Sequence, residues 1–175
     1  MTKSLFILVS LLVSGVVNAT PVSMTHDYVQ VQKFLQDLAT QNPRTTELIE
    51  IGQNESGIQI LGVKIGNGRT HNLVVGTHHG NEYGSTELAL QTAADFAKNP
   101  IADQTVYVIP VLNISGFNRN RREESLSFGG TADPNRNYPG PCGTGGPFTL
   151  ASTKALADFI RKEDIVVSAT LHTSG

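Results

Sequence analysis

The sequence contains one cysteine, Cys142, so an internal disulfide bond is impossible. Nothing in residues 140–143 suggests a base that would activate a thiol, and we expect Cys142 to have no catalytic role. The sequence also lacks a run of Lys and Arg, and its formal net charge is −2. Because nucleic-acid binding needs clustered basic side chains, we expect no nucleic-acid partner.

Charged residues make up only 16% of the chain, hydrophobic residues make up 39%, and there is no internal repeat or low-complexity tract. This composition is typical of a globular protein rather than of a disordered one. A length of 175 residues indicates a single domain.

The N-terminal segment has the pattern of a cleavable secretory signal peptide. Lys3 precedes a short apolar core, residues 5–13, and small residues occupy the positions before a cleavage point after Ala19. A membrane anchor is the alternative, but the apolar run is shorter than the ~20 residues that a spanning helix needs. We therefore predict a signal peptide over residues 1–19 and a secreted or periplasmic protein without a stable membrane anchor.

The periodicity of apolar residues predicts alternating helices and strands in residues 20–175. Helices are expected over 25–38, capped by Thr25, from about 85 to 97, and over 152–160, capped by Ser152. Strands are expected over 46–51, 58–65, 73–75, 105–112 and 166–172, the first two as an antiparallel hairpin. These elements predict an α/β fold whose mixed, mostly parallel central sheet is flanked by helices. The run 105–112 is nearly all apolar, as in a strand buried on both faces.

Polar residues at the ends of two predicted strands are candidate metal ligands. His79 and Glu82 lie three positions apart in the turn after residues 72–75, where both side chains can point the same way. His172 ends the last predicted strand, and side chains at strand ends gather at one edge of an α/β sheet. Zinc accepts imidazole and carboxylate ligands, and a catalytic zinc ion typically has three protein ligands and one water molecule. For the H-x-x-E pair alone, a polar loop with a surface histidine is the alternative.

Residues 113–147 are predicted to be irregular and rich in Gly, Asn, Arg and Pro, which for so long a segment indicates a functional loop. Arg122 and the pair Asn135–Arg136 lie in it, between the two ligand-bearing segments. A fixed cation can stabilise charge on a carbonyl oxygen, and a forked guanidinium can bind a free carboxylate. A solvated basic loop is the alternative.

Four motifs in order resemble the zinc metallocarboxypeptidases of the pancreatic carboxypeptidase A type. They are H-x-x-E at 79–82, N-x-x-G-aromatic at 113–117, N-R-N-aromatic at 135–138, and a histidine after an apolar strand at 171–172. The family segment reads N-P-D-G-aromatic, so Ile114 and Ser115 depart from it. The resemblance covers about residues 28–175 and implies a phosphorylase/hydrolase-like α/β fold.

The resemblance implies that one Zn²⁺ ion is bound by His79, Glu82 and His172. It implies that Arg122, with Arg121 as the alternative, polarises the scissile carbonyl.

By the same resemblance, Asn135 and Arg136 bind the terminal carboxylate of a peptide substrate. His78 is expected in the surroundings of the metal or at the surface, and His26 and His71 are expected to be structural.

In the family, a Glu on a later strand acts as general base and a Tyr from a late loop closes over the substrate. Neither can be assigned to a position before Gly175, so we expect the chain to be the N-terminal portion of a longer enzyme or the product of a truncated reading frame. In isolation we expect weak zinc binding, poor hydrolysis and an unpaired sheet edge.

Two further functions remain open. Zinc-dependent deacylases of N-acyl amino acids, of the aspartoacylase and succinylglutamate desuccinylase kind, resemble the same H-G-N-E and D-x-N-R segments. The other alternative is a non-catalytic module that binds zinc or a carboxylate.

Overall fold

The computed structural model describes residues 27–140 and 146–173. The predicted signal peptide, Thr25, His26 and Cys142 lie outside the described residues. No helix in the described part of the chain is long and apolar enough to cross a membrane. The larger elements, in chain order, are α1 (Tyr28–Gln41), β1 (Thr46–Gln53), β2 (Gln59–Ile65), β3 (Thr70–Val75), α2 (Tyr83–Lys98), β4 (Gln104–Ile109), α3 (Ile114–Arg119), α4 (Ala151–Lys162) and β7 (Val167–Thr170).

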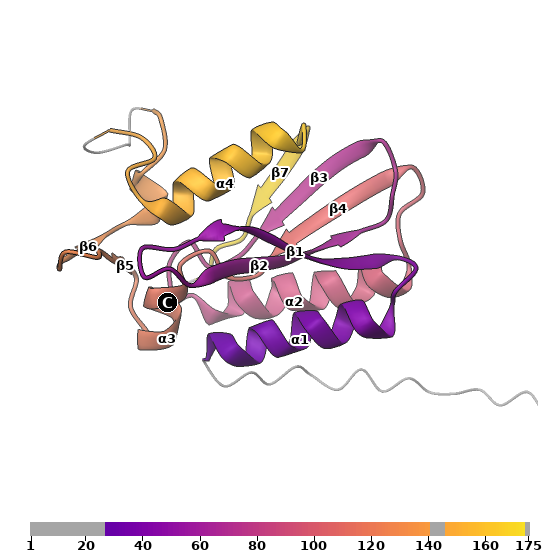
Figure 1. Ribbon diagram of the computed structural model, residues 1–175, viewed down its shortest axis with the longest axis horizontal. Helices are drawn as coiled ribbons and strands as arrows, with labels where there is room; N and C mark the ends of the chain where they lie inside the picture. The colour runs from indigo at the N-terminus through magenta and orange to yellow at the C-terminus, as the bar shows by residue number, and fades with distance from the viewer. Residues whose placement is uncertain (1–26, 141–145, 174–175) are drawn as a thin grey trace, which may run out of the picture.

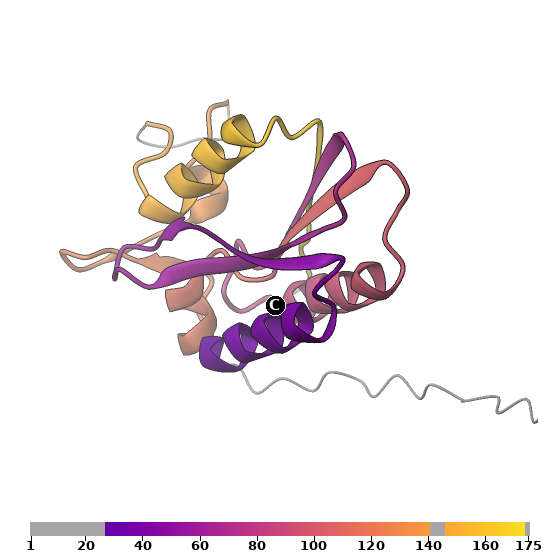
Figure 2. The same cartoon turned by 45° about the vertical axis from the view of Figure 1, so that its right-hand side comes forward.

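A five-stranded mixed sheet in the order β1-β2-β4-β3-β7 forms the centre of the fold. The strands β4, β3 and β7 are parallel to one another, whereas β2 is antiparallel to both β1 and β4. Helices α1 and α2 cover one face and α4 covers the other (Figure 1), and the rotated view shows the same three layers (Figure 2). The predicted α/β class and the antiparallel hairpin at its start are both confirmed.

The core lies where β4 passes through the middle of the sheet. The β4 strand is buried over 105–109, as predicted for a strand that is covered on both faces. From one side α1 contributes Val31, Leu35 and Leu38, which recur with helical spacing. From the same side α2 contributes mainly alanines, whose small side chains let the helix pack closely over the sheet.

Two predicted helix caps are wrong. Helix α1 starts later than expected: its N-cap is Asp27, whose carboxylate accepts a hydrogen bond from the Val29 amide at 3.0 Å. Helix α4 starts earlier: Leu150 is its N-cap, and Ser152 lies inside the first turn. The Ser152 hydroxyl instead donates to the carboxylate of Glu124, a buried partner that the local sequence does not reveal.

The segment predicted to be irregular contains short regular elements. Helix α3 occupies Ile114–Arg119, a small hairpin joins β5 (Glu124–Ser125) to β6 (Thr131–Ala132), and a single 3₁₀ turn, η1, covers Pro134–Arg136. None of these elements is longer than two helical turns, so none produces a detectable apolar period. They position the candidate site residues of this segment.

Strand β7 lies at an edge of the sheet. In the described part of the chain it pairs only with β3, and all four of its residues are exposed. Val167 is 61% exposed and the preceding Val166 is 65% exposed. The backbone pairing with β3, rather than side-chain burial, therefore holds this strand in place.

Glu124 is a fully buried carboxyl whose Oε1 atom has no hydrogen-bond partner in the described structure. Burial raises its pKa to about 7, helped by the nearby charge of Glu55 and opposed by the hydrogen bond from Ser152. The folded protein therefore keeps a proton that an unfolded chain releases near pH 4.5.

The free energy of unfolding should consequently fall as the pH rises from about 4.5 to about 7, and then level off. The substitution Glu124→Gln should flatten this dependence and, above pH 7, stabilise the protein by roughly 3 kcal/mol. Urea unfolding between pH 4.5 and 8 measures both effects. Glu123→Gln, at an exposed neighbour, is the control. Parallel stability curves for the wild type and Glu124→Gln would contradict this assignment.

Candidate metal centre

The turn between β3 and α2 is fixed from behind by buried polar groups. Thr77 has a positive φ of 56°, and its hydroxyl donates to the Pro110 carbonyl at 2.9 Å. The Thr77 amide donates to the hydroxyl of Ser85 at 3.0 Å, and that hydroxyl donates to the Glu82 carbonyl at 2.6 Å. These bonds join both ends of the turn to the first turn of α2, so the side chains on the turn have little freedom.

Gly80 lets the turn approach α3 more closely than any other residue could. A Cβ atom at this position would lie 2.1 Å from the carbonyl carbon of Gly116 and 2.3 Å from the amide of Phe117. The Gly80 amide donates to the carbonyl of Arg122 at 3.2 Å. The glycine inside the H-x-x-E motif is therefore required by packing, and it places the turn against the arginine segment.

Asn113 connects three parts of the site. It is the N-cap of α3, where its side-chain oxygen accepts from the Gly116 amide at 2.8 Å. Its side-chain nitrogen donates to the carbonyls of His78 at 3.2 Å and Arg122 at 2.9 Å. The asparagine of the N-x-x-G-aromatic motif therefore has a positioning role that its sequence alone does not show.

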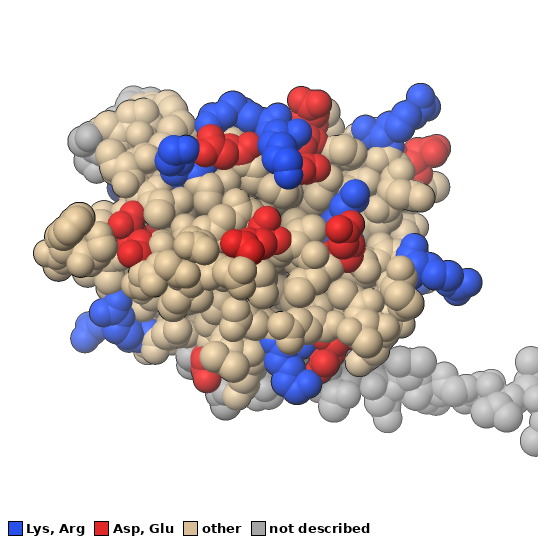
Figure 3. Space-filling model, in the orientation of Figure 1, with Lys and Arg blue, Asp and Glu red and all other residues tan. Residues whose placement is uncertain are grey.

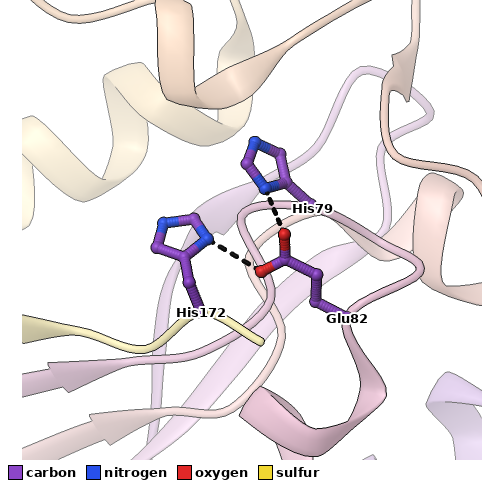
Figure 4. A group of neighbouring side chains, drawn as sticks. All are labelled: His79, Glu82 and His172. Carbon is purple, nitrogen blue, oxygen red and sulfur yellow. Dashed lines mark hydrogen bonds and ion pairs between the residues drawn. The ribbon is translucent and has the colours of Figure 1, made fainter. Parts of the chain in front are cut away.

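The structure brings His79, Glu82 and His172 together (Figure 4). Nδ1 of His79 lies 2.7 Å from Glu82 Oε1, and Nδ1 of His172 lies 2.8 Å from Glu82 Oε2. One ligand atom from each residue can be chosen so that all lie within 4.8 Å of one another. The three residues come from the two predicted segments, 90 positions apart, and they form a group of the size that a metal ion needs.

Strand pairing delivers His172 to this group. The register of β3 with β7 sets Val75 opposite Thr170, and the Leu171 amide continues the ladder by donating to the Val75 carbonyl at 2.8 Å. The next residue is therefore held beside the turn that leaves β3. The Thr173 amide also donates to Glu82 Oε2, at 3.1 Å.

The donor set fits zinc. Two imidazole nitrogens and a carboxylate match the His₂Glu ligands of one class of catalytic zinc site. Glu82 is suited to bind a cation: burial opposes its ionisation, but hydrogen bonds from His79, His172 and the Thr173 amide outweigh burial and lower its pKa. His79 and Glu82 are buried, whereas the His172 side chain is 34% exposed, so the group is open toward solvent on one side.

Asp133 contacts His79, and no role was predicted for it from the sequence. Its Oδ1 lies 3.1 Å from Nε2 of His79. If a cation replaced the proton that Nδ1 shares with Glu82, a hydrogen bond donated by Nε2–H to Asp133 would keep the Nδ1 lone pair directed at that cation. A carboxylate commonly holds a metal-bound histidine in this way. The sequence D-P-N-R marks Asp133 as part of a motif. The contact could not be predicted from it, because His79 and Asp133 are 54 positions apart.

Arg122 is held beside this pair. Its Nε and Nη2 atoms donate to Asp133 Oδ2 at 3.1 and 3.0 Å, and its Nη1 lies 3.3 Å from His79 Nδ1. Burial raises the pKa of Asp133, but the Asn135 amide, His79 and Arg122 together lower it further than burial raises it. Of the two arginines considered from the sequence, Arg122 is therefore the one next to the candidate ligands.

Asn135 and Arg136 lie in the 3₁₀ turn that starts after Asp133. The Asn135 amide donates to Asp133 Oδ1 at 2.8 Å, which ties this turn to the histidine pair. Arg136 is exposed, and its Nη1 donates to the Asn135 carbonyl at 3.1 Å. Neither side chain bonds to the candidate ligands in the described structure, so the structure places these residues near the site without assigning their role.

His78 is buried, at 2% exposure, rather than at the surface. Its Nε2 lies 2.7 Å from the hydroxyl of Tyr138. Burial, together with the neighbouring His172 and His79, lowers the pKa of His78 to about 3. His71 has a structural contact, since its Nδ1 lies 2.6 Å from the Glu163 carbonyl.

Comparison with known proteins identifies the family. The family model described as zinc carboxypeptidase matches residues 31–175. The chain belongs to the zinc carboxypeptidase family. Mouse carboxypeptidase D is 24% identical over 168 residues, which cover 84% of this chain and 12% of that protein. The solved structure of carboxypeptidase A from Helicoverpa armigera superposes with a TM-score of 0.76 at 18% identity, covering 90% of this chain and 49% of that one.

A more distant structure carries the same fold. A succinylglutamate desuccinylase from Silicibacter matches with a TM-score of 0.51 and 21% identity, over 75% of this chain and 40% of that one. The chain thus spans about half the length of the solved carboxypeptidase, and far less of carboxypeptidase D.

If Asp133 orients His79 for metal binding, Asp133→Ala should weaken zinc binding about 10- to 100-fold, because the imidazole loses the partner that fixes its tautomer. Titration of the purified protein against a chromophoric zinc chelator measures the affinity. The control is Asp37→Ala, at an exposed acidic residue on α1. An unchanged zinc affinity in Asp133→Ala would rule out this role.

Proposed function

We propose that this chain acts as a zinc-dependent metallocarboxypeptidase that hydrolyses the C-terminal peptide bond of peptides. The observation that carries the proposal is the meeting of His79, Glu82 and His172 at the ends of two parallel strands. Membership of the zinc carboxypeptidase family supports it. When bound there, a zinc ion would supply a Lewis acid and lower the pKa of a water molecule to about 7.

Arg122 is the residue that we propose stabilises the reaction at the carbonyl oxygen. Two of its nitrogens are held by Asp133, so the guanidinium is oriented before substrate arrives. Its Nη1 faces the ligand group, 3.3 Å from Nδ1 of His79. A preorganised donor at this place can stabilise negative charge that develops on the scissile carbonyl.

Asn135 and Arg136 are the residues that we propose bind the free carboxylate of the substrate. A guanidinium offers two parallel N–H groups to a carboxylate, and that of Arg136 is exposed. The hydrogen bond from the Asn135 amide to Asp133 fixes the distance between this turn and the ligand group. The proposed partner is therefore a peptide, or another small acylated amino acid, with a free carboxylate.

The carboxylates found at the site in the described residues are Glu82 and Asp133. Each is already bonded to a ligand histidine, at 2.7 Å and 3.1 Å respectively. Neither is free to accept a proton from water, so we assign no general base.

A deacylase acting on N-acyl amino acids is the second candidate. The likeness of fold to a succinylglutamate desuccinylase favours it, as does the sequence Asp133-Pro134-Asn135-Arg136. Both reactions need the same ligand group and a carboxylate-binding arginine. They differ in the acyl group, which is a peptide in one case and a short acid in the other.

Assays with hippuryl-type peptides and with short-chain N-acyl amino acids separate the two functions. We expect slow hydrolysis of the peptides in the presence of zinc, since no general base is assigned, and preferential hydrolysis of N-acyl amino acids would instead support the deacylase. His172→Ala should abolish activity and reduce bound zinc, because one of three ligands is lost. Full zinc stoichiometry in His172→Ala would remove that residue from the site.

Arg122→Ala, measured at saturating zinc, should lower kcat/KM by about 10²- to 10³-fold.

We also propose that the protein is exported, because residues 1–19 have the pattern of a signal peptide. Expression with its own N-terminus in a bacterial host tests this. The mass of the protein recovered from the periplasm or medium should correspond to a chain that starts at Thr20. Recovery of the uncleaved chain from the cytoplasm alone would refute the proposal.

A further inference from the structure

A basic pocket lies next to the candidate metal centre, between α3 and the β5–β6 hairpin. Its volume is about 580 Å³, and its lining residues are Arg119, Arg121, Arg122, Glu123, Ser125 and Thr131. In Figure 3, basic side chains project at the lower left of the molecule, where Figure 1 shows α3. The pocket therefore has more than enough room for a peptide side chain, and it carries a marked positive charge.

The charges that line the pocket do not cancel. Arg122 is paired with Asp133, and the carboxylate of Glu123 accepts a hydrogen bond from the Thr131 hydroxyl. Arg119 donates to the Ser115 carbonyl at 3.1 Å and to the Ser125 hydroxyl, and both partners are neutral. Besides the paired Arg122, the lining thus contains two arginines, Arg119 and Arg121, and one carboxylate, that of Glu123. The pocket therefore has a net positive charge.

Among the arginines that line the pocket, Arg121 is the one whose side chain is available to bind a ligand. Its guanidinium makes no hydrogen bond or ion pair with any residue that the structure describes, and it is exposed. Its backbone, however, is fixed, because its amide donates to the Gly116 carbonyl at 2.9 Å. A fixed backbone with a free cationic end is a suitable arrangement for binding an anion from solution.

Arg122 joins the pocket to the metal centre. It lines the pocket, and its Nη1 lies 3.3 Å from Nδ1 of His79. Its carbonyl accepts hydrogen bonds from Gly80 at 3.2 Å and from Asn113 at 2.9 Å, which holds this segment against the turn that carries the ligands. A substrate bound at the metal centre would therefore have this pocket within reach of its neighbouring residues.

We propose that this pocket binds the acidic side chain of a peptide substrate on the N-terminal side of the scissile bond, so that peptides with Glu or Asp there are preferred. The inference rests on the proposed carboxypeptidase function. Only one residue follows the scissile bond in such a substrate, and Asn135 and Arg136, proposed to bind its carboxylate, do not line the pocket. We therefore assign the pocket to a side chain that precedes the bond.

The test uses pairs of fluorescent peptides that differ only by Glu or Gln at one of the three positions before the C-terminal residue. Binding to the zinc-loaded protein is measured by anisotropy and hydrolysis by kcat/KM, at low salt and at 0.5 M NaCl. At one position we expect Glu to be favoured by roughly 1.5- to fivefold, the range for solvent-exposed charge pairs, and salt to reduce the preference.

Arg121→Gln and Arg119→Gln should each lower the Glu/Gln ratio toward one while leaving the Gln peptides unaffected. Arg44→Gln, at an exposed arginine between α1 and β1, removes the same net charge elsewhere and should leave the ratio unchanged. Equal treatment of Glu and Gln peptides by the wild type, or an equal effect of Arg44→Gln, would overturn the proposal. A preference for Glu in binding without any hydrolysis would support the proposed role of the pocket and refute the proposed carboxypeptidase function.

Discussion

The parallel pairing of β7 with β3 is the constraint on which the candidate centre depends. It places Thr170 beside Val75 and so brings His172 to the turn that carries His79 and Glu82. Since β7 is exposed along its length, main-chain hydrogen bonds and the contacts of Glu82 with His172 and the Thr173 amide hold this end of the site. A shift of one residue in the register would turn His172 toward the other face of the sheet.

The other half of the centre is much more rigid, because it is supported by buried polar groups rather than by one strand pair. Thr77 and Ser85 close the turn from behind, and Asn113 links it to α3 and to the segment of Arg122. Asp133 then joins the arginine to the histidine. The result is a layer of fixed dipoles on one side of the ligand group and an open side formed by His172, an arrangement suited to a reaction at a preorganised ion.

The sequence was informative wherever a pattern was local. The H-x-x-E spacing and the apolar runs before His79 and His172 predicted that His79, Glu82 and His172 meet at one sheet edge, as they do in the structure. The role of Asp133 could not be predicted, because a contact across 54 positions depends on the short turns of residues 131–136. Ser152 has the residue type of a helix cap, but its hydroxyl is bonded to Glu124, which only the tertiary structure brings near.

The exposure of β7 has a thermodynamic consequence for metal binding. His172 follows β7, the least buried strand of the five-stranded sheet, so an ion held by all three side chains would also cross-link the end of that strand to the turn that carries His79 and Glu82. By linkage, the free energy with which the ion favours the docked strand equals the free energy by which docking strengthens ion binding. Amide hydrogens of residues 167–171 should therefore exchange more slowly as the ion concentration rises, whereas those of β4 should be little affected.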